Sequence, residues 1–76
     1  MEKETKLRKQ MRAARTKGEL IKLLQSMEIP KDYYHEHDQH ARLLKDLKWD
    51  LATGGRETPM RIARERAIHI ALFAGL

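Results

Sequence analysis

Residues 33–52 read YYHEHDQHARLLKDLKWDLA and form the longest run of the chain with a helical repeat. Apolar, aromatic or imidazole side chains recur there after four and three residues in alternation, the spacing that places side chains along one side of an α-helix. The repeat predicts a helix from about Tyr33 to Ala52 with a heptad seam that packs against other helices. The seam consists of Tyr33, His37, His40, Leu44, Leu47 and Leu51.

The segment before this run has the start and stop signals of another helix. Thr16 and Glu19 have the spacing of a capping box, in which the Thr hydroxyl accepts from the Glu amide and the Glu carboxylate accepts from the Thr amide. Pro30 ends this helix because the residue before a proline avoids the helical conformation. Asp32 is then placed to cap the run that follows. The buried face is expected to consist of Leu20, Leu23, Leu24 and Met27.

The segment after the run predicts a further helix. Gly54 and Gly55 supply a left-handed helix end and a turn, and Thr58 and Pro59 follow as N-cap and first helical residue. Small residues on one stripe allow another helix to approach closely, and the stripe consists of Met60, Ala63, Ala67, Ile70, Ala71 and Ala74. The second half is apolar on nearly every side, which is typical of a buried helix. We therefore expect a homodimer, with Ile68, Ile70, Leu72 and Phe73 at its interface, or with the seam of residues 33–52 there.

The start of the chain predicts a helix from about Glu2 to Arg15 that has only a small apolar surface to bury. Its apolar stripe is narrow, consisting of Leu7, Met11 and Ala14, and basic side chains cover most of the rest. Helices gain most of their stability from burying a wide apolar face. We expect this helix to fray, or to be only partly ordered, without a partner.

Length and composition favour one small all-α domain. The 76 residues divide into a basic N-terminal helix or arm (1–15) and a helical body (16–76), which gives a bundle of three to four helices. No segment alternates with period two, so no sheet is expected. The absence of cysteine excludes disulfides and thiolate metal sites, and a second subunit is a usual means of stabilising so small a domain.

The chain lacks the features of a secreted or membrane protein. Charges begin at residue 2, and the longest mostly apolar run, Ala67–Leu76, is half of the ~20 residues that a membrane span needs. We expect a cytoplasmic protein that does not enter a membrane.

The net charge of +5 lies entirely in the first seventeen residues. Seven basic and two acidic residues occur from Met1 to Lys17, and nine of each occur from Gly18 to Leu76. A localised cationic segment is typical of proteins that meet a polyanion or an acidic protein surface. The predicted phosphate contacts are Lys6, Arg8, Lys9, Arg12, Arg15 and Lys17. Arg61, Arg64 and Arg66 form a smaller basic group that Glu57 and Glu65 partly neutralise.

Two further features allow a functional and a structural interpretation. Trp49 lies opposite the seam, with Arg42 and Lys45, where it could contact a protein partner or stack on a base. We favour the alternative that a neighbouring helix covers Trp49 as core. His35, His37 and His40 could hold a metal or sense pH, but they lack the H-E-x-x-H spacing of metalloproteases, and we favour packing at the seam. No metal or cofactor is assigned.

No catalytic constellation is evident. The chain has no cysteine nucleophile, one serine (Ser26), no Gly-rich phosphate loop and no carboxylate pair in an apolar setting, so we expect no enzymatic activity. Residues 33–38 are net acidic, which disfavours reading of the major groove by that helix. We expect a small bacterial or phage accessory protein that regulates by binding nucleic acid, mainly its backbone. The alternative is an adaptor or inhibitor that docks on an acidic protein.

Overall fold

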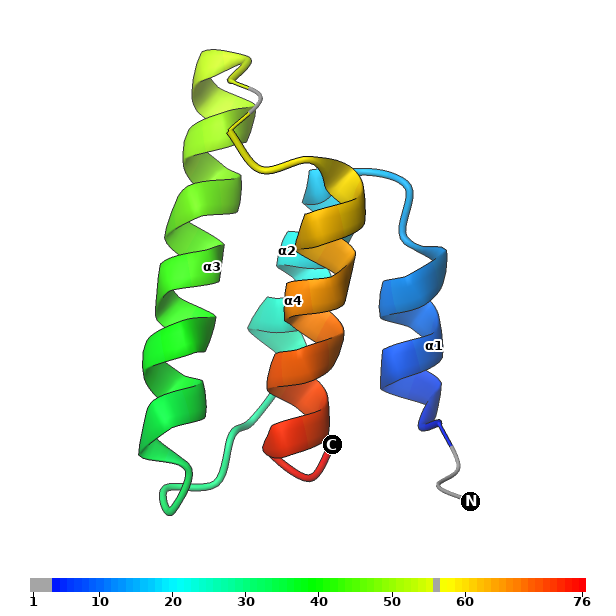
Figure 1. Ribbon diagram of the computed structural model, residues 1–76, viewed down its shortest axis with the longest axis vertical. Coiled ribbons are helices and arrows are strands. Elements are labelled where there is room, and N and C mark those ends of the chain that lie inside the picture. Colours follow the sequence, from blue (N-terminus) through cyan, green and yellow to red (C-terminus); the bar gives the residue numbers. More distant parts are fainter. Residues whose placement is uncertain (1–3, 56) are drawn as a thin grey trace.

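Four helices make up the described part of the chain, residues 4–55 and 57–76 of a computed structural model. They are α1 (Lys6–Ala13), α2 (Lys17–Ser26), α3 (Tyr34–Thr53) and α4 (Met60–Phe73). Figure 1 shows α3 and α4 side by side and antiparallel, with α2 behind them and α1 on the far side of α4. Contacts join α1 to α2 and α4 but not to α3. The predicted all-α bundle is confirmed.

The core is centred on α4, which contacts each of the other three helices. The predicted small stripe is confirmed, since Ala63, Ala67 and Ala71 are completely buried. Alanine side chains let neighbouring helices approach α4 on several sides. Large side chains then fill the space between them, and those that are fully buried are Met11, Leu20, Leu24 and Leu47.

The N-terminal segment is built into this bundle and is not a projecting arm. Met11 is completely buried and Ala14 is nearly so. The helix is shorter than expected, because Thr5 caps it by accepting from the Arg8 amide and Ala14 already has extended backbone angles. The Thr5 hydroxyl also donates to the carbonyl oxygen of Leu76 at 2.9 Å. Residues 1–3, where the predicted helix began, lie outside the described residues.

The beginning of α2 follows the prediction more closely than its end. The Glu19 amide donates to the Thr16 hydroxyl at 3.2 Å, as a capping box requires. The Glu19 carboxylate, however, accepts from the amide of Arg15 instead of Thr16. The helix ends at Ser26, before the predicted stop at Pro30, and the Ser26 hydroxyl donates to the Leu23 carbonyl at 2.7 Å. Serine hydroxyls compete in this way with the helical hydrogen-bond pattern.

The predicted caps of α3 and α4 at their N-terminal ends are wrong. Tyr33, not Asp32, is the cap of α3, because a turn closes there when the Tyr33 amide donates to the Pro30 carbonyl. Pro59, not Thr58, caps α4. The C-terminal end of α3 is as expected, with Gly54 in the left-handed conformation at φ +66°.

The predicted seam of α3 is confirmed at Leu44 and Leu47, which pack in or against the core, but it is wrong towards the two ends of the helix. The buried side of this helix is formed by Leu43, Leu47 and Asp50, whereas His37 and Leu51 of the seam are exposed. Asp50 can lie inside because Lys17 neutralises it at 2.7 Å. Leu51 is near the C-terminal end of α3, which extends past the neighbouring helices (Figure 1).

Candidate nucleic-acid interface

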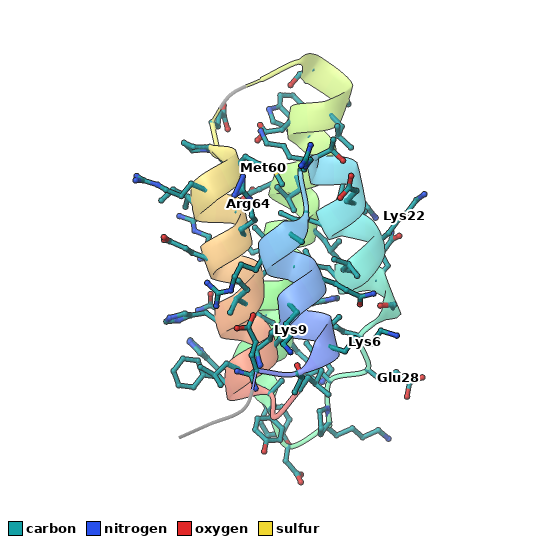
Figure 2. All side chains as sticks on the ribbon, turned by 90° about the vertical axis from the view of Figure 1, so that its right-hand side faces the viewer. Lys6, Lys9, Lys22, Glu28, Met60 and Arg64 are labelled. Carbon is teal, nitrogen blue, oxygen red and sulfur yellow. The ribbon has the colours of Figure 1, made fainter. Side chains whose placement is uncertain are left out.

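The packing of α1 beside α4 brings basic side chains from two distant segments to one side of the bundle. In Figure 2, α1 faces the viewer with Lys6 and Lys9, and Arg64 of α4 lies next to it. Arg61 lies one helical turn before Arg64 and therefore on the same side of α4. We use the name basic face for the cations of α1 and of the residues that follow it, together with those of neighbouring α4. We define it as Lys6, Lys9, Arg12, Arg15, Arg61 and Arg64.

The basic-face side chains of residues 6–15 are accessible. Lys6, Lys9 and Arg15 are exposed. Arg12 pairs with Glu4 at 3.0 Å, but its side chain is 65% exposed. An exposed ion pair of this kind contributes only about 0–1 kcal/mol, so a phosphate could replace Glu4 at little cost.

The two remaining predicted phosphate contacts have intramolecular roles instead. The Nε of Arg8 donates to the carbonyl oxygen of Leu76 at 3.4 Å, beside the Thr5 hydroxyl that bonds the same oxygen. The ammonium group of Lys17 lies 2.7 Å from Asp50, and its side chain is 16% exposed. Both side chains are half-buried, in contrast to the exposed cations of the basic face.

Asp50 links three segments behind the basic face. Its Oδ2 accepts from the Lys17 ammonium and from the Thr58 amide, at 2.7 and 3.3 Å. The hydrogen bond from Lys17 lowers the pKa of Asp50, against the opposing effect of burial. The start of α2, the end of α3 and the turn before α4 are thereby joined. Asp50 is absent from the residues predicted from the sequence, although its spacing from Leu43 and Leu47 places it on their side of the helix.

Trp49 lies on the exposed side of α3, so the expectation that it belongs to the core is wrong. It is 57% exposed. Arg42 and Lys45 are exposed on the same side of the helix, which makes a small aromatic and cationic surface. Because α1 does not contact α3, this surface is separate from the basic face.

The histidines make hydrogen bonds within the chain. The Nε2 of His40 lies 2.6 Å from the Leu24 carbonyl oxygen, which fits the expected packing at a helix edge. His37 lies 3.2 Å from the Pro30 carbonyl oxygen, and His35 lies 3.0 Å from Gln39. Within the described residues, no three His, Cys, Asp or Glu side chains converge as a metal site would require.

The predicted dimer residues do not share one surface. Ile70 is buried within the single chain. Ile68 packs against the core and Leu72 is half-buried. Phe73 is the exception, since it is 58% exposed. Contacts within the single chain therefore bury several side chains, such as Ile70, that were predicted to be buried by a second copy.

Comparison with known proteins adds no relative, because no family model, curated protein or solved structure matches this chain. Among the described helices, none combines the length and the apolar character that a membrane span requires.

Proposed function

We propose that this protein binds the phosphate backbone of nucleic acid through the basic face. The observation that supports this most strongly is the packing of α1 against α4, which adds Arg61 and Arg64 to the cations of the N-terminal segment. Cations that neutralise phosphates release condensed counterions, which drives binding and makes it depend on salt. We place the protein among small bacterial or phage accessory proteins that act in the cytoplasm.

The shape of the basic face favours contacts with phosphates over the reading of bases. α1 has eight residues and lies between α4 and α2 (Figure 2). A helix of about 12 Å that is flanked on both sides cannot enter deeply into a major groove. Tyr34 and Trp49 are exposed on α3, and the exposed Phe73 at the end of α4 lines a pocket shared with α3. Without a stacking partner on the basic face, a duplex is a better ligand than a single strand.

The test measures the fluorescence anisotropy of a labelled, mixed-sequence DNA duplex as salt is raised. We expect binding in the micromolar range or tighter at low salt. The triple variant Lys6→Gln, Lys9→Gln and Arg12→Gln removes three exposed cations of the basic face. It should weaken binding at least tenfold and flatten the slope of log K against log salt by about 3. Arg61→Gln should flatten it by about 1 more.

A matched control removes the same charge elsewhere. Lys31, Lys45 and Lys48 are also exposed, and their triple replacement by Gln should leave most of the binding intact. Equal losses in the two triple variants would show that the basic face is not the site. Absence of binding by the unchanged chain to duplex and single-stranded probes at low salt would refute the proposed function.

A second candidate function is docking on an acidic protein partner. The exposure of Trp49 beside Arg42 and Lys45 favours it, because tryptophan and arginine are frequent energetic centres of protein interfaces. The comparison is a pull-down from cell extract with and without nuclease. Capture of a protein that survives nuclease treatment and is lost on Trp49→Ala would support this candidate, and capture that depends on nucleic acid would support the first.

A further inference from the structure

A continuous groove runs between α3 and α4 on the face that α1 and α2 leave uncovered. Three adjoining pockets of about 310, 290 and 220 Å³ form it, and Gln39 and Ile70 line all three. Phe73 lines one end, is 58% exposed as a residue, and has its ring in edge-on contact with that of His69. Ile62 lines the 290 Å³ pocket. The groove thus has an apolar floor and an exposed aromatic ring, and the proposed nucleic-acid contact does not use it.

Both walls of the groove carry charges of both signs. On α3, Arg42 and Asp46 line the same pocket, and on α4 the neighbouring residues Glu65 and Arg66 line another. Arg42, Glu65 and Arg66 are exposed. A strongly acidic or strongly basic partner would meet a repelling charge on each wall. A surface with the same mixture of charges could instead place an opposite charge against each one.

We propose that the groove is the surface on which a second copy of this chain docks, with the α3/α4 face of each copy against that of the other. A second copy carries the same mixed charges and the same exposed Phe73, as the self-complementary interface of a two-fold dimer requires. The net charge of +5 arises in residues 1–17, and their helix α1 does not contact α3. Contact through the α3/α4 face therefore keeps the most strongly repelling segments out of the interface.

The size of the face sets the strength of the expected dimer. α4 has 14 residues, which makes it about 21 Å long, and two neighbouring helices span roughly 20 Å across. Each copy can therefore bury roughly 400–600 Å², below the ~800 Å² per partner of a standard stable interface. The dimer should be reversible and should form in the range from micromolar to millimolar concentration.

The test is sedimentation equilibrium of the full chain without nucleic acid, so its result does not depend on the proposed function. We expect the mass to rise from 9.0 kDa towards twice that value as concentration rises from micromolar to millimolar. The variant Arg42→Glu with Arg66→Glu makes the groove acidic, and Asp46→Lys with Glu65→Lys makes it basic. Each variant alone should remain a monomer, and an equal mixture of the two should associate.

Controls separate loss of docking from loss of folding. Circular dichroism of both groove variants should match that of the unchanged chain, and Phe73→Asp should dissociate the dimer without reducing helicity. Lys22→Glu, on the exposed side of α2, should leave the association unchanged. A monomer at millimolar concentration, groove variants that still dimerise, or a mixture that fails to associate would each overturn the proposal.

Discussion

At the level of single residues, Asp50 joins three segments that are far apart in the sequence, and no sequence motif predicts this role. The residue is 3% exposed, and its carboxylate accepts hydrogen bonds from the Lys17 ammonium group of α2 and from the Thr58 amide in the turn before α4. A buried charge is costly unless it is paired and hydrogen-bonded. Lys17 and Thr58 together make this position tolerable, and they fix the start of α2 against the end of α3.

Replacement of Asp50 should reveal this role through the pH dependence of stability. The pKa of Asp50 lies below its ordinary value of 3.8, chiefly because Lys17 donates a hydrogen bond. Such a group stabilises the fold above its unfolded pKa, and the contribution is lost as pH falls through the folded pKa. Asp50→Asn should therefore lower the melting temperature at neutral pH. Its difference from the unchanged chain should shrink as pH falls well below 3.8, measured by circular dichroism.

The matched control is Asp38→Asn, at an exposed position of the same helix. It should leave the melting temperature nearly unchanged at every pH, since surface substitutions usually alter stability by no more than about 0.5 kcal/mol. A difference between Asp50→Asn and the unchanged chain that stays constant from neutral to acidic pH would contradict an ionised, paired Asp50.

At the level of helices, glycine ends both long segments of the bundle by taking up left-handed angles. Gly54 follows α3 with φ +66°, and Gly75 follows α4 with φ +76°. After α4, the Gly75 amide donates to the Leu72 carbonyl and the Leu76 amide donates to the Ala71 carbonyl. This pair of hydrogen bonds is the Schellman pattern. It orients the Leu76 carbonyl, which in turn receives Thr5 and Arg8 from the N-terminal segment.

Two glycine substitutions should have opposite effects on stability. Gly54→Ala should lower the free energy of unfolding by about 1–2 kcal/mol, because a side chain disfavours left-handed angles even where there is room for it. There is room, since no atom lies within 4 Å of the added Cβ. Gly18→Ala, in the first turn of α2 with its nearest neighbour at 3.8 Å, should raise the same free energy by about 0.5–1 kcal/mol. Urea denaturation measures both.

The two glycine substitutions are compared by whether each one raises or lowers the free energy of unfolding. A loss of stability in Gly18→Ala as large as that in Gly54→Ala would contradict the expectation that backbone conformation decides the sign of each change. Circular dichroism before denaturation would confirm that each variant retains the helical content of the unchanged chain.

At the level of the whole molecule, α1 is necessary both to the fold and to the basic face. It covers α4 and contributes Met11 to the core. Loss of one buried methionine side chain costs about 2–5 kcal/mol. A domain of this size has only about 4–11 kcal/mol of total stability, at roughly 0.05–0.15 kcal/mol per residue.

A truncated chain of residues 16–76 should therefore fail to fold cooperatively. We expect a broad thermal transition by circular dichroism and binding of the dye ANS, the signs of lost side-chain packing. The full-length triple variant Lys6→Gln, Lys9→Gln and Arg12→Gln should melt like the unchanged chain, because these side chains are exposed. A truncated chain with the original melting temperature would mean that α1 is a dispensable arm. Substitution of charges, not truncation, is thus the fair test of nucleic-acid binding.

Local features were readable in the amino-acid sequence because they act within a turn or two of backbone. The Thr16 cap, the left-handed Gly54 and the alanine stripe of α4 were all predicted and are present. The charge at the start of the chain also pointed to Lys6 and Lys9, which are exposed. Such features depend on neighbouring residues alone, so residue type and spacing suffice to predict them.

Residues far apart in the chain decide which side of each helix is buried and which side chains come together on one surface. Lys17 looked like a phosphate contact, but it lies against Asp50, 33 positions away. The buried side of α3 includes Leu43 and Asp50, which the predicted seam left out, and Trp49 remains exposed. Arg61 and Arg64 joined the N-terminal cations because α1 packs on α4. These outcomes depend on the total free energy of packing and charge pairing in the folded chain. They cannot be predicted from any one segment alone.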